Sequence, residues 1–218
     1  MTRTLSASLI ESGAVSRLED LELAGEPVAN STFALGNVAE MHIPAEEGAL
    51  LTFLARLTSA RTIIEVGALT GYSTMALAEA VGPGGSVITC GSTGKWAQIA
   101  RTAWHRAGFT DRIEPIFGPA TETIRAFPEC PLFDLAFIDA DKARYVEYWE
   151  ALVPRVRPGG LLIADRMMSP QETGNARAIG EFDAYVHADH RVEPVLPTVT
   201  DGITVARKKP IQPQEAGR

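Results

Sequence analysis

The chain has few cysteines and no secretion signal, and both absences bear on where it functions. Cys90 and Cys130 are the only cysteines among 218 residues, too few for the disulfide framework of a small secreted domain. Residues 1–8 contain no apolar signal core, so we expect a cytoplasmic chain with both thiols reduced. Cys90 ends an apolar run, which predicts a small core residue and not a catalytic thiol.

Positive charge and long apolar runs are also lacking. The formal net charge is −7, and a protein that neutralises nucleic acid phosphates needs a basic face, so nucleic acid is not expected as a partner. No segment has the length and apolarity of a membrane span, so a membrane is not expected either. The 45% hydrophobic and 22% charged residues are ordinary for a globular domain of this length.

Short apolar runs alternate with helical patterns from residue 61 onward. The apolar, β-branched runs lie at 62–66, 86–90, 112–117, 132–138 and 160–164, with helical patterns between them at 73–81, 95–107, 120–127 and 143–156. Strands that alternate with helices predict βαβ units and a parallel sheet, which is an α/β fold. A further helix is expected at 175–188 and further strands at 192–196 and 202–206.

The two ends of the chain carry weaker patterns. Residues 1–57 predict an N-terminal helical cap, in which Leu50, Leu51, Leu54 and Leu57 form an apolar stripe just before the first strand. Residues 209–218 are polar and proline-rich, and we expect a disordered tail there. Because no repeat and no interdomain linker interrupts the pattern, residues 1–208 are expected to form one domain.

A glycine-rich turn follows the first predicted strand. Residues 65–73 read EVGALTGYS and lead into a good helix-forming segment. Such a turn brings backbone N–H groups and a helix N-terminus close to a ligand. The glycine spacing differs from the dinucleotide fingerprint, and the acid Glu65 suits a cationic or hydrogen-donating ligand such as S-adenosylmethionine. The alternative is a tight strand-to-helix connection without a ligand.

Carboxylates follow several of the predicted strands at their carboxyl ends, where open parallel sheets bind ligands. Asp139 and Asp141 follow the fourth strand, and Asp165 ends the fifth. One helical crossover separates Asp139 from Asp165, so their strands are expected to be neighbours and their side chains to converge. Converging carboxylates suit a hard cation such as Mg²⁺, although aspartates at strand ends also cap the helices that follow.

Other chemically capable side chains have weaker support. Lys142 lies three residues after Asp139 and could serve as a base if a metal or burial lowered its pKa, but residue type alone favours a solvated lysine at a helix start. His187 and His190 could pair on a metal, but no third ligand is apparent, so a surface position is expected for both.

Four segments, in this order, resemble the cation-dependent O-methyltransferases of the catechol and caffeoyl-coenzyme A type. They are residues 41–48 (MHIPAEEG), 65–73 (EVGALTGYS), 137–142 (FIDADK) and 201–208 (DGITVARK). The resemblance implies a Rossmann-like class I methyltransferase fold, with a mostly parallel seven-stranded sheet, helices on both faces and an antiparallel C-terminal strand. It also implies methyl transfer from S-adenosylmethionine to a hydroxyl of a small acceptor, and a homodimer.

The resemblance further implies a set of site residues. Cofactor contacts are implied at Ile43, Glu65, Gly67, Ala68, Ser73, Gly91, Ala120 and Asp141. Ser73 and the N–H groups of the turn would hold the methionine carboxylate, and Asp141 would face the methionine amino group. Mg²⁺ or another divalent cation would bind Asp139, Asp165 and the residue after it. Lys142 matches the lysine proposed to deprotonate the acceptor hydroxyl.

Two positions depart from the family pattern. Gly91 stands where an acid usually receives the ribose hydroxyls, so weaker cofactor binding or a changed loop is expected. Arg166 stands where an asparagine usually completes the metal site, and a guanidinium has no acceptor with which to bind a cation. Arg166 could instead place its own charge in the metal's position, paired with Asp139 or Asp165. Alternatively, Asn175 could serve as a ligand, or Arg166 could point to solvent while the two aspartates, water and substrate still hold Mg²⁺.

These observations leave more than one function open. The leading hypothesis is an O-methyltransferase that acts on a phenolic or other secondary-metabolite hydroxyl, with weakened or altered metal dependence and with Lys142, Asp139 and Arg166 as catalytic residues. The alternative is a catalytically inactive relative that acts as a binding or interaction protein. A third possibility is methylation of nitrogen on the same fold. The acceptor is not specified by the sequence.

Overall fold

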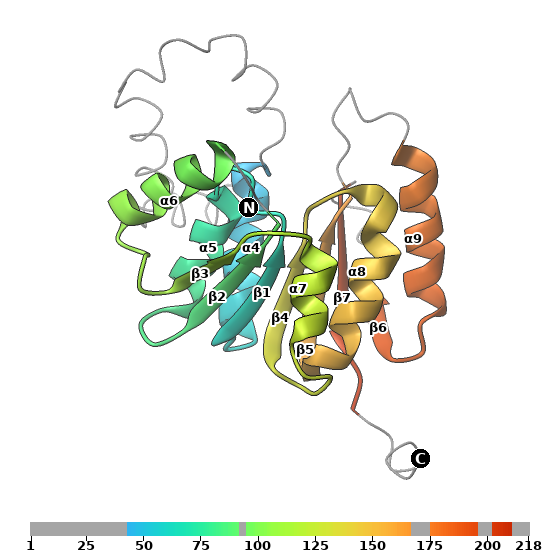
Figure 1. The fold of residues 1–218 in the computed structure, drawn as a ribbon. Coiled ribbons are helices and arrows are strands. Elements are labelled where there is room, and N and C mark those ends of the chain that lie inside the picture. The colour runs from blue at the N-terminus through green and yellow to red at the C-terminus, as the bar shows by residue number, and fades with distance from the viewer. Residues whose placement is uncertain (1–42, 92–94, 167–174, 196–201, 211–218) are drawn as a thin grey trace, which may run out of the picture.

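The computed structural model describes residues 43–91, 95–166, 175–195 and 202–210. In these residues seven strands form one sheet in the order β3-β2-β1-β4-β5-β7-β6 (Figure 1). The strands are β1 (Thr62–Val66), β2 (Ser86–Cys90), β3 (Ile113–Ile116), β4 (Phe133–Ile138), β5 (Val156–Asp165), β6 (Val192–Val195) and β7 (Ile203–Lys208). The first five strands are parallel, and β7 is antiparallel to both of its neighbours.

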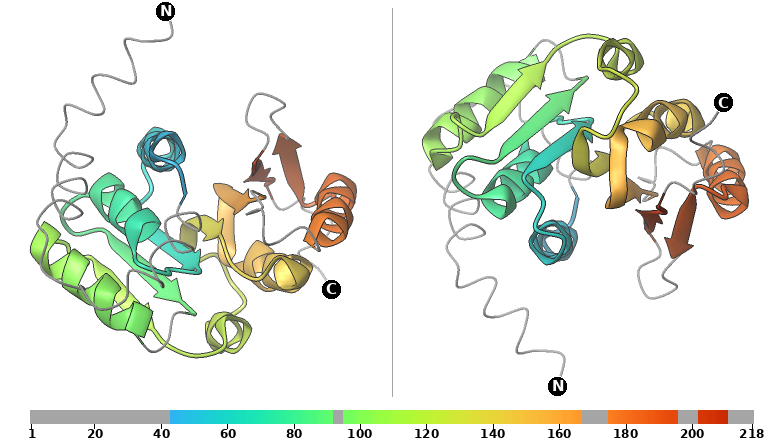
Figure 2. Two further views of the ribbon diagram at one scale, coloured as in Figure 1. Left: turned by 90° about the horizontal axis from the view of Figure 1, so that it is seen from above. Right: turned by 90° about the horizontal axis from the view of Figure 1, so that it is seen from below.

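Helices cover both faces of the sheet (Figure 2). One face carries α4 (Ala45–Leu57), α5 (Tyr72–Val81) and α6 (Lys95–Ala107), and the other carries α7 (Ala120–Ala126), α8 (Tyr145–Leu152) and α9 (Ala176–Ala188). Short 3₁₀ turns at Lys142–Arg144 and Val153–Arg155 flank α8. None of the helices in the described residues combines the length and apolarity needed to cross a membrane.

The central strand β1 shows why the sequence folds in this way. Ile63 packs into the core beneath α4–α6, whereas Ile64 and Val66 pack into the core beneath α7–α9. All three side chains are fully buried. A strand buried on both faces carries apolar, β-branched residues on both sides instead of an alternating pattern. Ile63, Ile64 and Val66 supply them here, and Glu65 is the buried polar exception.

The expected class I α/β fold is confirmed, with local corrections. β5 begins at Val156 and not at residue 160, because a register shift opposite Phe133 and Leu135 carries Pro158 and Gly159 within the strand. Gly160 is required there, since a Cβ atom would lie 2.6 Å from the carbonyl oxygen of Asp134. The helix expected over 143–156 is one α-helix between two 3₁₀ turns. Most of the helical cap (residues 1–42) and most of the tail (211–218) lie outside the described residues.

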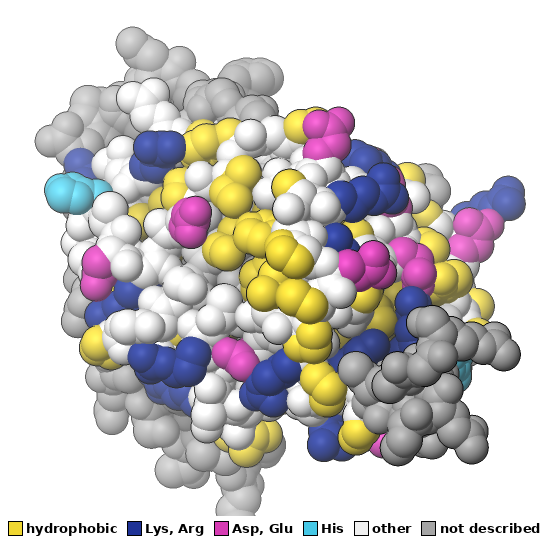
Figure 3. Space-filling model, turned by 60° about the horizontal axis from the view of Figure 1, so that its bottom comes forward, with side chains coloured by type: hydrophobic (Ala, Val, Ile, Leu, Met, Phe, Trp, Pro, Cys, Tyr) yellow, Lys and Arg dark blue, Asp and Glu magenta, His cyan; other side chains and the backbone are white. Residues whose placement is uncertain are grey.

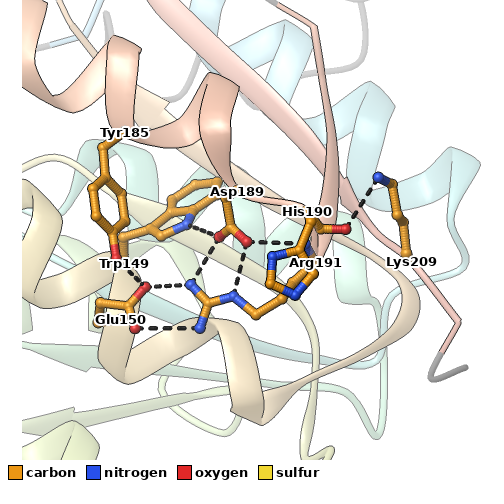
Figure 4. A network of polar contacts seen from close by, with 7 residues as sticks. All are labelled: Trp149, Glu150, Tyr185, Asp189, His190, Arg191 and Lys209. Carbon is orange, nitrogen blue, oxygen red and sulfur yellow. Dashed lines mark hydrogen bonds and ion pairs between the residues drawn. The ribbon is translucent and has the colours of Figure 1, made fainter. Parts of the chain in front are cut away.

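A polar network ties the β6 edge of the sheet to α8 and α9 (Figure 4). Asp189 accepts hydrogen bonds from the indole of Trp149 at 2.9 Å and from Nε of Arg191 at 2.8 Å, and Arg191 also pairs with Glu150. Burial acts to raise the pKa of Asp189, but the bonds from Arg191 and Trp149 outweigh burial and hold the pKa at about 2. The network is therefore a structural clamp that stays ionised.

Asp134 joins three strands at the edge of the sheet opposite the carboxyl ends. Its Oδ2 atom accepts backbone N–H bonds from Arg61 at 2.7 Å and Thr62 at 2.8 Å, and its Oδ1 atom pairs with Nε of Arg157 at 2.5 Å. These bonds connect the starts of β1, β4 and β5.

Replacing Asp134 with alanine is expected to lower the free energy of unfolding by about 2–4 kcal/mol, because three donors lose a charged acceptor. Urea denaturation measures the loss. Asp111→Ala is the control, since Asp111 is exposed and meets Arg112 only at 3.9 Å, and such a change stays within about 0.5 kcal/mol. Equal losses of unfolding free energy in the two variants would show that the bonds of Asp134 do not stabilise the sheet.

Candidate active site

The carboxyl ends of three neighbouring strands bring the predicted chemistry together. β1, β4 and β5 lie side by side, and the backbone N–H of Asp139 donates to the carbonyl of Val66 at 2.8 Å. Asp139 follows β4 and Asp165 ends β5. One ammonium group lies within 4 Å of both carboxylates. The expected convergence of Asp139 and Asp165 is confirmed.

The glycine-rich turn between β1 and α5 has a backbone that only glycine adopts easily. Gly67 has φ +100° and Gly71 has φ +89°, values that L side chains rarely adopt. A Cβ atom on Gly67 would lie 1.8 Å from the carbonyl oxygen of Asp139. The turn therefore lies tightly against the end of β4, and it leads directly into the N-terminus of α5, whose first N–H groups have no partners within the helix.

Glu65 is completely buried behind this turn, with 0% of its surface exposed. Its two carboxyl oxygens are bonded to the hydroxyls of Ser73 at 2.6 Å and Thr74 at 2.5 Å. Burial raises the pKa of Glu65 to about 7, against the stabilising hydroxyls. Glu65 therefore orients the hydroxyls of the first turn of α5. Its contact with a cofactor, expected from the sequence, stays a prediction.

Lys142 is buried between the two aspartates. Its Nζ atom lies 3.2 Å from Oδ1 of Asp139 and 3.7 Å from Oδ2 of Asp165, and it donates to the hydroxyl of Tyr145 at 2.8 Å and to the carbonyl of Asp165 at 3.0 Å. The residue is only 4% exposed. A solvated lysine, the reading that residue type alone favoured, is therefore wrong. The ammonium group is part of the site.

Arg166 is directed away from Lys142 and its two aspartates. Its guanidinium pairs with Asp183 of α9 at 2.8 Å and donates to the carbonyl of Ile203 at 3.3 Å. The hypothesis that Arg166 pairs with Asp139 or Asp165 is wrong, and so is the alternative of a solvent-facing side chain, because only 14% of the Arg166 side chain is exposed. The partner of the Arg166 guanidinium is therefore Asp183, an acid on α9 that lies 17 residues away in the sequence.

The donor set does not match the one expected for a divalent cation. Asp139 and Asp165 supply carboxylate oxygens, but the ammonium of Lys142 lies between them and Arg166 supplies no acceptor. Within the described ranges, no three His, Cys, Asp or Glu side chains are grouped so that they could hold a metal ion. The residues present do not form a complete oxygen-ligand cage, and no step proposed below depends on one.

Glu47, in the first turn of α4, is a site residue that the sequence analysis missed. It is 9% exposed, and its Oε1 atom is buried without a hydrogen-bond partner. Burial, together with the charges of Asp165 and Asp139, raises the pKa of Glu47 to about 8. Its neighbour Glu46 is exposed. In the sequence both residues look like ordinary carboxylates of a first helical turn. Their difference in burial results only from the packing of α4 against the sheet.

Replacing Glu47 with glutamine is expected to stabilise the protein increasingly as pH rises. A raised pKa means that the folded state keeps a proton that the unfolded chain loses from about pH 4.5, so the wild-type protein loses stability up to about pH 8. Glu47→Gln removes this loss, a gain of about 1–3 kcal/mol above pH 8 and little at pH 4.5. Denaturation at both pH values measures it. Glu46→Gln should show no such gain, and a pH-independent effect of Glu47→Gln would contradict the prediction.

The other predicted residues fall into two groups. Ile43, Ala68 and Ala120 are buried around the rim, whereas Asp141 is exposed and accepts from the N–H of Ala143 at 3.2 Å, so it caps the 3₁₀ turn. Gly91 has φ +116°, and among the described residues a Cβ there would approach only the backbone nitrogen of Gly67, at 3.9 Å. Position 91, where the family pattern has an acid, therefore has a backbone conformation that favours glycine.

Three further side chains match their predicted positions. His187 and His190 are both exposed. Cys90 is buried, and burial raises the pKa of its thiol to about 12. The thiol is therefore protonated at neutral pH, as a core cysteine is.

Comparisons with known proteins agree with this geometry. The O-methyltransferase family matches residues 20–209. A catechol O-methyltransferase of Mycobacterium tuberculosis is 35% identical over 154 residues, which is 69% of this chain and 70% of the relative. A caffeoyl-CoA O-methyltransferase of Populus kitakamiensis is 30% identical over 194 residues, 82% of this chain and 83% of the relative. The crystal structure of the O-methyltransferase from Bacillus cereus in complex with SAH has a TM-score of 0.70 at 30% identity, covering 91% of both chains.

Proposed function

The chain belongs to the O-methyltransferase family, and we propose that, as an S-adenosylmethionine-dependent enzyme of that family, it methylates a hydroxyl of a small acceptor next to Lys142. The observation that carries this proposal is the buried Lys142 ammonium between Asp139 and Asp165, beside the glycine-rich turn. S-adenosylmethionine supplies an electrophilic methyl group when bound. The protein must then hold an acceptor oxygen in line with that methyl and stabilise the charge that develops on the oxygen.

Lys142 has the geometry for the second task. Its Nζ atom donates hydrogen bonds as an ammonium does, and positive charge next to an acceptor oxygen favours the oxyanion form that attacks the methyl group. Tyr145 donates to the carbonyl of Asp165 at 2.6 Å and accepts from Lys142, so it locks the direction of the lysine side chain. Asp139 lies on the same side and is positioned to receive the acceptor's proton.

The turn and the start of α5 are proposed to bind the methionine end of the cofactor. The positive end of the α5 helix dipole and the hydroxyl of Ser73 suit a carboxylate. The absence of side chains at Gly67 and Gly71 lets the turn pack closely against the protein, because a Cβ atom there would overlap Asp139 or Trp104. Ile43, Ala68, Ala120 and Asp141 are proposed to complete the pocket, with Asp141 facing the methionine amino group.

Metal dependence is proposed to be weak, with Lys142 supplying the positive charge that a divalent cation would bring. This replaces the hypothesis that assigned that charge to Arg166, whose guanidinium is paired with Asp183. The role that remains proposed for Arg166 is indirect, since it connects the end of β5 to α9 next to Asp165.

Calorimetric titration with S-adenosylmethionine, with Mg²⁺ and after chelator treatment, tests the function. Saturable binding that chelator does not change, followed by methylation of a hydroxylated aromatic panel in the presence of chelator, is the expected result. Binding without any methyl transfer across the panel would favour a binding protein. Activity that is lost on chelation and restored by Mg²⁺ would disprove the weak metal dependence.

Arg166→Asn supplies the matched control for the metal question. An asparagine after Asp165 restores an oxygen ligand, so Mn²⁺ affinity, followed by electron paramagnetic resonance, should rise relative to the wild-type protein. An unchanged Mn²⁺ affinity would show that the Arg166 position does not set cation binding.

The proposed partners are a small hydroxylated molecule and a second copy of the chain. The relatives are named for catechol and caffeoyl-CoA, which supports a phenolic or secondary-metabolite acceptor here. On the face drawn in Figure 3, basic and acidic side chains are interspersed, which does not suggest a basic tract for nucleic acid. A cytoplasmic location and a homodimer are proposed from the family and the composition.

A binding protein without catalysis is the second candidate, and Gly91 favours it. The position that usually binds the ribose has no carboxylate, and its φ of +116° disfavours any side chain there. Measurable affinity for S-adenosylmethionine together with methyl transfer would exclude this candidate.

A further inference from the structure

Glu65, Ser73 and Thr74 form a buried hydrogen-bond group behind the glycine-rich turn. The carboxyl has two oxygens, and each is bonded to one hydroxyl, at 2.6 Å and 2.5 Å. None of the three residues is more than 6% exposed. A hydroxyl has one proton to donate. An ionised Glu65 has no proton to donate, so each of the two hydroxyls must donate its single proton to the carboxylate.

The protonation state of Glu65 determines what Ser73 presents to a ligand carboxylate at the N-terminus of α5. When Glu65 is ionised, Ser73 presents only lone pairs to the ligand, and a second negative charge lies directly behind it. When Glu65 is protonated, it can donate to the oxygen of Ser73, and the Ser73 proton is then free to point at the ligand. The same protonation removes the charge that repels the ligand carboxylate.

We infer that Glu65 is a positioning residue whose proton turns the Ser73 hydroxyl toward the carboxylate of the cofactor, so that cofactor binding is coupled to protonation of Glu65. The inference rests on the proposed function, because it assumes that Ser73 meets the methionine carboxylate of S-adenosylmethionine. The proton comes from solvent and goes to a Glu65 oxygen, and no covalent bond to the ligand forms or breaks.

The surroundings of Glu65 make this coupling effective near neutral pH. Thr89 of β2 faces the carboxyl in addition to Ser73 and Thr74, and the charged group that acts on it is Asp139 at the end of β4. The Cys90 thiol nearby stays neutral because its pKa is raised to about 12. Burial, the largest influence, raises the pKa of Glu65 to about 7.

Binding of S-adenosylhomocysteine at several pH values tests the inference. Wild-type affinity should fall by up to about tenfold per pH unit above pH ~7, because the protonated fraction of Glu65 falls about tenfold with each unit. Glu65→Gln, which is neutral at every pH and whose amide can donate to Ser73, should bind with little pH dependence over the same range. Ser73→Ala should bind more weakly and lose most of the pH dependence. Glu46→Gln, an exposed acid on α4, should behave like the wild-type protein.

A matched ligand separates Glu65 from the ligand's own amine. The decarboxylated analogue of S-adenosylhomocysteine keeps the amine but has no carboxylate, so its binding should not take up the extra proton. Calorimetry of wild-type protein in buffers of different ionisation enthalpy counts the protons for both ligands, and this measurement needs no variant.

The outcomes distinguish the two levels of the proposal. Equal proton uptake with both ligands, or a Glu65→Gln profile identical to wild type, would overturn the inference while leaving the proposed function intact. No binding of S-adenosylhomocysteine at any pH would overturn both. Proton uptake confined to the carboxylate-bearing ligand and abolished by Glu65→Gln is the expected result.

Discussion

Replacing Lys142 with methionine is expected to lower the rate of methyl transfer by a factor on the order of 10²–10⁴, the usual contribution of a positioned proton-transfer or charge-stabilising group. Methionine fills similar space but donates no hydrogen bond. The Lys142 side chain is bonded to Asp139, Tyr145 and the carbonyl of Asp165, so its loss removes the only ammonium held between the two aspartates in the described residues. Steady-state kinetics at saturating S-adenosylmethionine measures the fall.

Two controls make the Lys142 result specific. Lys209→Met changes an exposed contact to the carbonyl of His190 and should leave the rate unchanged. The affinity of Lys142→Met for S-adenosylhomocysteine should be close to wild type, because Lys142 is proposed to contact the acceptor and not the cofactor. A variant that keeps more than about a tenth of the wild-type rate would remove Lys142 from the catalytic residues.

The same variant also reports on cations. With the ammonium gone, Asp139 and Asp165 lose the positive group that lies within 4 Å of both carboxylates, and a hard divalent ion becomes a favourable replacement. Mn²⁺ should therefore bind Lys142→Met more tightly than it binds the wild-type protein. The opposite order would mean that Lys142 does not compete with a cation for these carboxylates.

Replacing Gly67 with alanine is expected to cost more than about 3 kcal/mol of folding free energy and to abolish cofactor binding. Two effects combine at this position. The φ of +100° is unfavourable for any L side chain, and the added methyl would lie 1.8 Å from the carbonyl oxygen of Asp139. Relief of that overlap must separate the turn from the end of β4, which dismantles the site.

Gly108→Ala separates the two effects. Gly108 has φ +75°, and a Cβ there meets no atom of the described residues within 4 Å, so only backbone strain of about 1–2 kcal/mol is expected. Thermal and urea denaturation of both variants measure the difference, and calorimetry measures S-adenosylmethionine binding. Equal destabilisation of the two variants would show that the contact with Asp139 has no energetic consequence.

Local sequence patterns determined the alternation of strands and helices, the turn at residues 65–73 and the aspartates at the ends of β4 and β5. Each of these depends on neighbours in the chain: a strand needs a short apolar run, a tight turn needs glycine, and a crossover helix places Asp139 beside Asp165. The same reasoning misplaced the start of β5, because the bulge at Gly160 results from the approach of the β4 backbone and not from any local signal.

The fold class, the family and the edge of the sheet that carries the candidate site were therefore predictable from the chain's local patterns. The pairing of charges at that edge was not, because it depends on how the helices pack against the sheet. Lys142 lies between Asp139 and Asp165, and Arg166 forms an ion pair with Asp183. Glu47 is buried, whereas Glu46 is exposed. The reason is physical: the ion pair of Arg166 and the surroundings of Glu47 depend on groups distant in sequence, and burial sets the cost of each charge only after the helices have packed against the sheet.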